Sequence, residues 1–169
     1  DGDGSMDLVL ANRDGQPNYI YFGSKFVKKI TYGTGSDESR DVDVGDMDGD
    51  GQLDIVVANI GDRNMIYYGS NKRSYIRSKA FGDPAAATHS IMLADLDRDG
   101  NRDIVVGNKG QRNHYYLNNK KELMKYTFGQ KDGDTYGVTI GNLDGDAYPD
   151  IVTANSGGWN IIYYNRPPK

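Results

Sequence analysis

The sequence has no cysteine, five prolines, one tryptophan and two histidines among its 169 residues. Without cysteine the chain can form neither a disulfide framework nor a thiolate metal site. No apolar run approaches the ~20 residues that a membrane-spanning helix needs, and no segment has the 3.6-residue periodicity of an amphipathic helix. We therefore expect an all-β chain without a membrane span.

Glutamate is almost absent as well, since Glu38 and Glu122 are the only two among 24 acidic residues. A surface evolved only for solubility would use both acids, so the bias toward the shorter carboxylate indicates turns and cation coordination. The formal net charge of -4 comes without the clustered basic stripe that nucleic-acid binding requires. Nucleic acid is therefore not expected as a partner.

What the chain does contain is one pattern written four times: an aspartate-rich turn, a β-branched run and a tyrosine-rich run. The copies read DGDGSMDLVLAN, DMDGDGQLDIVVAN, DLDRDGNRDIVVGN and NLDGDAYPDIVTAN. The last aspartates of the turns are Asp7, Asp54, Asp103 and Asp150, spaced by 47, 49 and 47 residues. A fixed period of this length indicates a repeat architecture.

The second copy shows the strands of one repeat. Residues 40–46 alternate in polarity, which is typical of a strand, and the β-branched run 55–57 is typical of a strand buried on both faces. Residues 65–68 and the more charged 75–81 predict two more strands. Four short antiparallel strands per ~40–50 residues make the blade of a β-propeller.

We therefore predict a single β-propeller segment over residues 1–169, with about four blades of four antiparallel strands. The expected blades are about 1–33, 40–82, 88–129 and 136–165, the two outer ones being partial. The chain opens inside a turn, so the lack of a recognisable targeting segment says nothing about its parent protein. We expect the chain to be part of a larger ring, with a closed four-bladed ring as the alternative.

The turns have the composition of a hard-cation site. Counted from Asp46, carboxylates occupy positions 1, 3, 5 and 9, a glycine occupies position 6, and the carbonyl of position 7 is available. Calcium takes 6–8 oxygen ligands, and four clustered aspartates would repel one another without a cation. An EF-hand would need a glutamate at position 12 and a following helix. Position 12 instead holds Leu10, Val57, Val106 and Thr153, so an EF-hand is rejected.

The four copies are unequal as calcium sites. In the fourth, Asn142 removes one charge and Ala147 replaces the glycine, although alanine resists a positive φ; the first copy lacks position 1. We expect the second and third turns to bind more tightly than the fourth, and the fourth more tightly than the first. The candidate ligands are Asp46, Asp48, Asp50, Gln52 and Asp54; Asp95, Asp97, Asp99, Asn101 and Asp103; Asn142, Asp144, Asp146, Tyr148 and Asp150; and Asp1, Asp3, Ser5 and Asp7.

The core from Gly45 to Asn59 (GD-x-D-x-DG-x-x-DIVVAN), the N-x-x-Y-Y runs and the pairs Phe81-Gly82 and Phe128-Gly129 resemble the FG-GAP/VCBS repeat family. This family includes the integrin α-subunit propeller. The resemblance implies a propeller, usually seven-bladed, with structural Ca²⁺ held between the first and second strands by the turn residues named above, up to four ions in all.

The resemblance also implies a ligand face, formed by the loops that join second to third strands opposite the calcium turns. We expect a protein or glycan ligand there. Trp159 is a candidate for stacking on a sugar or anchoring a protein, with covering of a blade end as the alternative. Arg63 and Arg112 hold the equivalent position and are either anion contacts or solvated loop residues. The asparagines that flank each of these loops are expected to cap it.

No catalytic constellation is recognisable. His89 and His114 hold unrelated positions in the repeat, and the clustered carboxylates are already explained by the turns. We predict a non-enzymatic, calcium-stabilised adhesion or recognition module, and weak calcium sites place it outside the cell, where calcium is abundant. The alternative is a structural or assembly segment of a larger secreted enzyme or filament.

Overall fold

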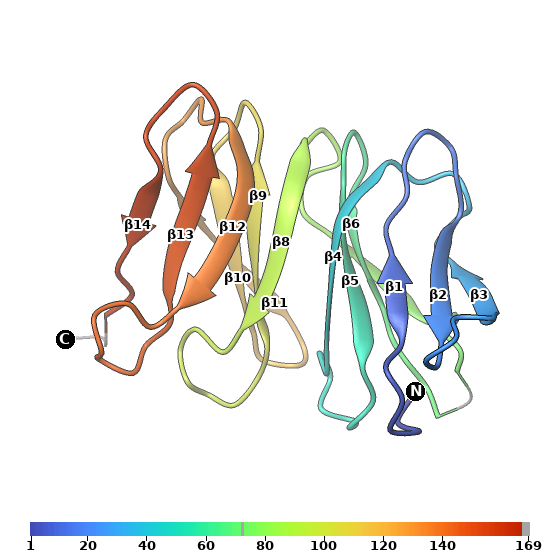
Figure 1. Ribbon diagram of the computed structural model, residues 1–169. Helices are drawn as coiled ribbons and strands as arrows, with labels where there is room; N and C mark the ends of the chain where they lie inside the picture. Colours follow the sequence, from blue (N-terminus) through green and yellow to red (C-terminus); the bar gives the residue numbers. More distant parts are fainter. Residues whose placement is uncertain (72, 167–169) are drawn as a thin grey trace.

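The computed structural model describes residues 1–71 and 73–166, which form fourteen β-strands and no helix (Figure 1). The strands are β1 (Leu8–Leu10), β2 (Asn18–Phe22), β3 (Lys28–Tyr32), β4 (Ser39–Gly45), β5 (Asp54–Asn59), β6 (Asn64–Tyr67), β7 (Ser78–Phe81), β8 (Thr88–Ala94), β9 (Asp103–Asn108), β10 (Asn113–Asn118), β11 (Leu123–Phe128), β12 (Thr135–Gly141), β13 (Asp150–Asn155) and β14 (Ile161–Tyr163). Within the described ranges, a helix long and apolar enough to cross a membrane is not found.

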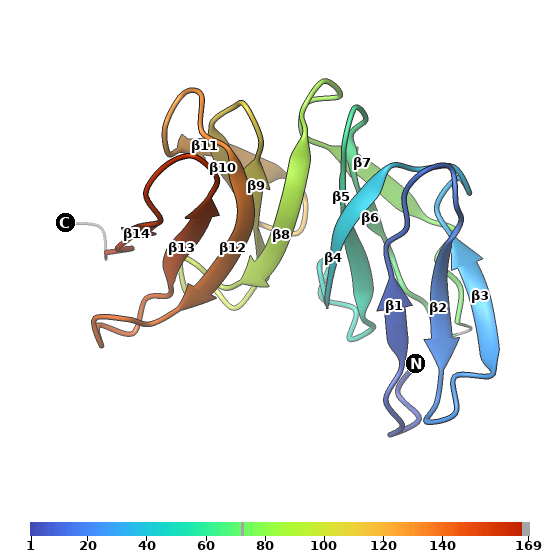
Figure 2. The same cartoon turned by 45° about the horizontal axis from the view of Figure 1, so that its top comes forward.

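The strands form four antiparallel sheets, each built from strands that follow one another in the chain. We name them sheet 1 (β1–β3), sheet 2 (β4–β7), sheet 3 (β8–β11) and sheet 4 (β12–β14). The sheets stand in chain order with their faces toward one another (Figures 1 and 2). The prediction of an all-β chain made of four antiparallel sheets with three or four strands is confirmed.

The core lies between the sheets rather than within any one of them. All six residues of β5 and all six of β9 are buried, because sheets 2 and 3 are covered on both faces. Three apolar clusters join sheets 1 and 2, sheets 2 and 3, and sheets 3 and 4. Continuous β-branched runs suit such strands, since both faces of the pleat are dry.

One strand is shorter than the sequence predicts. Residues 75–81 were expected to form a strand, but β7 begins only at Ser78. Tyr75 instead packs against the apolar cluster between sheets 1 and 2, so the preceding chain leaves the ladder. A single backbone hydrogen bond, from Tyr68 N–H to the Arg77 carbonyl (2.9 Å), continues the pairing beyond the strand.

The aromatic-glycine pairs mark the contacts between sheets. Phe81 meets Tyr116 of the next sheet edge to face, with ring centroids 5.2 Å apart, and the pairs Tyr32–Tyr67 and Phe128–Tyr163 repeat the arrangement. Gly82 then takes φ +80°, and an added Cβ would lie 3.3 Å from Asn64 Nδ2. A glycine is needed there because L-residues rarely adopt this conformation.

A second device crosses each contact between sheets. Asn64 Nδ2 donates to Thr88 Oγ1 (3.2 Å) of the next sheet, and that hydroxyl donates to Asn108 Oδ1 (2.9 Å). The same relay runs through Ser39 and Thr135 at the other two contacts. All these groups are buried or half-buried, so the relay satisfies polar atoms that would otherwise be costly to bury.

Candidate metal centres

The last aspartate of each turn fastens the turn to its sheet. The Asp54 carboxylate is fully buried and accepts hydrogen bonds from Met47 N–H (2.8 Å) at the start of the turn and from Gly69 N–H (2.8 Å) after β6. Asp103 and Asp150 are bonded in the same way. Each of these carboxylates therefore ties the turn to the first residue of the second strand and to the end of the third.

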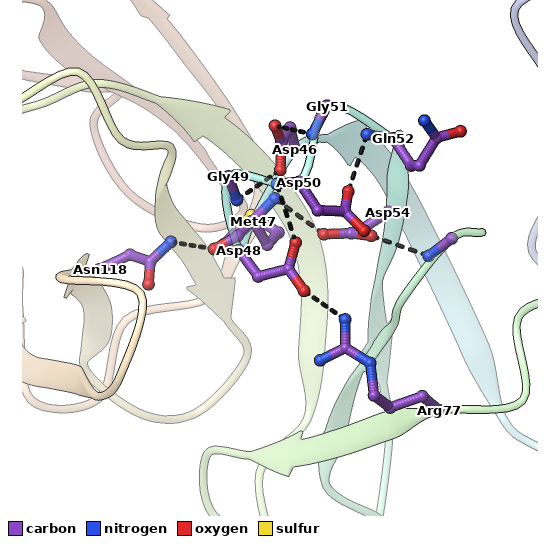
Figure 3. A network of polar contacts seen from close by, with 11 residues as sticks. Asp46, Met47, Asp48, Gly49, Asp50, Gly51, Gln52, Asp54, Arg77 and Asn118 are labelled. Carbon is purple, nitrogen blue, oxygen red and sulfur yellow. Dashed lines mark hydrogen bonds and ion pairs between the residues drawn. The ribbon is translucent and has the colours of Figure 1, made fainter. Parts of the chain in front are cut away.

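The second turn folds its remaining carboxylates toward one point (Figure 3). Asp46 accepts from Gly49 N–H (2.7 Å) and Gly51 N–H (2.9 Å), which curls the backbone around it. Asp48 and Asp50 each accept from the N–H two residues further on. As a result Asp46, Asp48 and Asp50 each offer an oxygen within 4.8 Å of the others.

The third turn forms the same kind of group from Asp95, Asp97 and Asp99, again with oxygens within 4.8 Å. It differs from the second turn at its first carboxylate. Asp95 Oδ1 is buried and has no hydrogen-bond partner. A buried carboxylate oxygen without a partner is costly, and a divalent cation is the partner that three converging carboxylates fit best. The residues present therefore suit a calcium ion.

The last aspartates of the second and third turns are buried, which disfavours their ionised forms. Burial raises the pKa of Asp103 to about 6, opposed by hydrogen bonds from Asn118 and Leu96 and helped by the negative charges of Asp97 and Asp99. Burial likewise raises the pKa of Asp54 above its usual value. A bound divalent cation would favour the ionised forms of both groups.

In the described ranges, only the second and third turns bring three carboxylates together. The fourth turn places Asn142 where they have aspartate, and its Oδ1 accepts from Gly145 N–H (2.7 Å). Ala147 does adopt a left-handed conformation there, with φ +77° against +83° for Gly51 and +86° for Gly100. The alanine therefore accepts strain in order to keep the same turn.

Arginine side chains approach three of the four turns at the same position, the third. Arg77 forms an ion pair with Asp48 (Figure 3), Arg73 with Asp1 (2.5 Å), and Arg166 with Asp144 (3.8 Å). Asp97 of the third turn has no such ion pair in the part of the chain that the structure describes. The third turn is thus the one whose carboxylates are least neutralised by the protein itself.

The repeated turn and strand pattern matches a known protein family. The pattern of the FG-GAP-like repeat matches residues 1–57, 46–106 and 95–153, each match running from one turn into the second strand of the next copy. The chain belongs to the FG-GAP-like repeat family. A search of curated proteins finds no match.

The position-7 residues of these FG-GAP-like repeats point their backbone N–H groups into the turns. Gln52 N–H donates to Asp50, and Asn101 N–H donates to Asp99, both at 2.8 Å. Tyr148 and Ser5 make the equivalent bonds in the fourth and first turns. These bonds orient the position-5 carboxylates. From the sequence, only the carbonyls of the position-7 residues were expected to contribute to the turns.

Two asparagines that the sequence reading missed hold a turn from the neighbouring repeat. Asn118 Nδ2 donates to the Met47 carbonyl (2.8 Å) in the second turn (Figure 3), and Asn165 Nδ2 donates to the Leu96 carbonyl (2.7 Å) in the third. Each follows the last aspartate of its own turn by 15 residues. This shared spacing could have indicated the two asparagines from the sequence, although the second copy has Gly69 at the equivalent position.

The expected ligand loops lie at the other end of the second strands. Asn59 Nδ2 holds the Arg63 carbonyl, Asn108 Nδ2 the Arg112 carbonyl, and Asn155 Nδ2 the Trp159 carbonyl, all at 2.8 Å. The prediction that asparagines cap these loops is confirmed. The same backbone arrangement thus presents an arginine in two repeats and a tryptophan in the third, and all three side chains are exposed.

Trp159 is 89% exposed, so it does not cover the end of a sheet. It borders a cavity of about 240 Å³ between sheets 3 and 4, whose other walls are mostly polar and include Asp132, Asp134 and Asn155. This end of sheet 4 thus combines an exposed indole with polar groups.

Proposed function

We propose that this chain is a calcium-stabilised recognition module, formed by four blades of a larger, seven-bladed β-propeller. The blades are about residues 1–33, 40–82, 88–129 and 136–165, and each corresponds to one of the four sheets. The observation that carries the proposal is the third turn, where three carboxylates converge and Asp95 Oδ1 is buried without a partner.

Calcium in this proposal has a structural role. The carboxylates at positions 1, 3, 5 and 9, together with the carbonyl of position 7, would hold the ion, which neutralises their mutual repulsion. The ion would fasten the turn between the first and second strands. Such exposed sites suit the millimolar calcium found outside the cell, in keeping with the extracellular occurrence of FG-GAP-like repeats.

Recognition is assigned to the face opposite the turns, and the module performs no catalysis. Loops fixed on rigid sheets are well suited to binding, and the Asn59, Asn108 and Asn155 caps fix these loops. Trp159 and its polar cavity favour a glycan or a polar protein surface as the ligand, with Arg63 and Arg112 as further contacts.

A second candidate function is that of an assembly segment, and it also has an observation in its favour. Leu143 is 52% exposed, whereas Met47 and Leu96, at the same place in their turns, are 3% and 4% exposed. Ile162 of β14 is likewise 45% exposed, against 1% for Ile66 of β6. These positions are covered by a neighbouring sheet elsewhere in the chain, so sheet 4 presents a surface suited to a further sheet of the same kind.

Thermal unfolding with and without calcium tests the structural role. Calcium at 100 times its Kd should stabilise the fold by about 2.7 kcal/mol for each independent site, and a chelator should reverse the effect. Magnesium at the same concentration serves as the control, because it dehydrates reluctantly and prefers few protein ligands. No change of the midpoint with calcium would refute the proposal.

A glycan and matrix-protein binding screen separates the two functions. Trp159→Ala should abolish binding to any ligand found, while Ile76→Ala, which removes a 91% exposed side chain near the turns, should leave it intact. Concentration-dependent assembly in light scattering, with no ligand found, would favour the assembly segment.

A further inference from the structure

The first strands of sheets 2, 3 and 4 carry a β-bulge at the same place. The pairing of β4 with β5 skips Arg40, that of β8 with β9 skips His89, and that of β12 with β13 skips Tyr136. Each skipped residue follows the buried serine or threonine of the relay between sheets (Ser39, Thr88 and Thr135). A bulge redirects one side chain, and bulges are frequent beside functional sites.

The three redirected side chains come from neighbouring strands, since β4, β8 and β12 lie side by side (Figures 1 and 2). The His89 and Tyr136 rings are 4.6 Å apart between centroids, and Lys109 Nζ lies 5.7 Å from the Tyr136 centroid. Arg40 Nε is buried and has no hydrogen-bond partner. An arginine donor in that state is suited to an added acceptor.

His89 lies among two cations and one carboxylate. Burial lowers the pKa of His89, and the positive charges of Arg40 and Lys109 lower it further, while Asp134 opposes them. Asp134 is the acidic group that acts on His89, and its Oδ1 already accepts from Gly110 N–H (2.9 Å). Two permanent cations therefore face one partly engaged carboxylate, which leaves the cluster positive.

The fold itself does not require this chemistry. The neighbouring serine, threonine and asparagine residues recur from sheet to sheet because they build the relay, whereas the bulged residues are an arginine, a histidine and a tyrosine. A guanidinium, an ammonium and a phenol are all hydrogen-bond donors. The neutral imidazole donates from one nitrogen, and the protonated imidazole donates from both. A group with several acceptor oxygens is the ligand that such a set matches.

We propose that Arg40, His89, Lys109 and Tyr136 form a binding site for an oxyanion group, such as sulfate, phosphate or carboxylate, on the face opposite the calcium turns. This inference rests on the proposed recognition role of this face and specifies the chemical class of the ligand. Arg40 supplies its two-pronged guanidinium, Lys109 a point charge and Tyr136 a hydroxyl. His89 binds more strongly once protonated.

The test uses the full chain and its two histidines, which are the only ones in the sequence. The ring proton resonances of His89 and His114 are followed by NMR during titration with sulfate, phosphate or acetate, each against chloride at constant ionic strength. Saturable shifts should occur at His89 alone. Bound anion should also raise the pKa of His89, because it favours the imidazolium form. The three anions identify which group the site prefers.

Arg40→Gln and Lys109→Gln should each weaken anion binding about tenfold, since each removes one charge-assisted contact. Lys28→Gln, which removes the same charge from an exposed position of β3, is the control and should leave it unchanged. Unchanged affinity in Lys109→Gln, or equal shifts at both histidines, would overturn the inference. Lys109 is exposed, so that variant decides the matter even if Arg40→Gln fails to fold. Calcium-dependent melting of the same samples shows independently whether the proposed module stands.

Discussion

The second and third turns have the same acidic pattern, yet they differ in how the protein neutralises it. In the second, Asp48 is paired with Arg77, and both oxygens of Asp46 accept backbone hydrogen bonds. In the third, Asp97 has no ion pair among the described residues, and Asp95 Oδ1 is buried without a partner. Two turns that the sequence ranks together therefore differ in their need for a cation.

The difference begins at position 4 of the turn. Gly49 takes φ +80° and donates its N–H to Asp46, whereas Arg98 takes φ +64° in the same place. The Arg98 guanidinium lies over the Tyr148 ring of the fourth turn, 5.5 Å from the centroid, instead of pairing with its own carboxylates. Position 4 is not a ligand position, but its backbone N–H decides whether both carboxylate oxygens of position 1 accept a hydrogen bond. The third turn should therefore depend most on calcium.

The largest effect should come from removing two charges of the third turn. Asp95→Asn with Asp97→Asn should lower its calcium affinity about 100-fold, or roughly 2.7 kcal/mol, because calcium affinity follows the number of charged ligands. Calorimetric titration should show one tight site fewer. The matched double variant Asp46→Asn with Asp48→Asn should lower the calcium affinity of the second turn by a smaller factor. An equal or larger loss of affinity there would contradict the comparison between the two turns.

Removing the arginine of the second turn should make the two turns more alike. Arg77→Gln takes away a cation that competes for Asp48, so calcium affinity at the second turn should rise about fivefold, or roughly 1 kcal/mol. Without calcium the same variant should melt earlier, since four aspartates lose a counter-charge. Lys79→Gln removes an equal charge from β7 and is the control; a matching gain there would mean that only net charge matters.

The strands and turns could be predicted from the sequence because they depend on local patterns. The β-branched runs after each turn became β1, β5, β9 and β13, and the glycines of positions 4 and 6 took positive φ as a tight turn requires. The tyrosines after them became the third strands, and the rings of Tyr67, Tyr116 and Tyr163 contact an aromatic ring in the last strand of the preceding sheet. Each of these properties is encoded within about ten residues and is repeated from copy to copy.

The partners of the turns could not be predicted, because they depend on where other segments pack. Arg77 was placed in a strand, but it lies just before β7, where the preceding chain turns away and Tyr75 packs between sheets 1 and 2. The Asn118 bond to the Met47 carbonyl joins residues 71 positions apart. The bulges at Arg40, His89 and Tyr136 were also missed, because each lies one residue inside its strand and too few residues precede it for the change of alternation to be seen in the sequence.

The smallest effect should come from position 6, where the comparison extends to the fourth turn. Ala147 holds φ +77°, a conformation that costs an L-residue about 1 kcal/mol and a glycine almost nothing. Ala147→Gly should therefore stabilise the fold by up to about 1 kcal/mol, reduced by the greater entropy of glycine in the unfolded chain. Gly100→Ala in the third turn should lower the free energy of unfolding by a similar amount. Urea unfolding in calcium-free buffer measures both changes. If Ala147→Gly destabilises the chain while Gly100→Ala does not, the two turns do not share the backbone path on which their comparison rests.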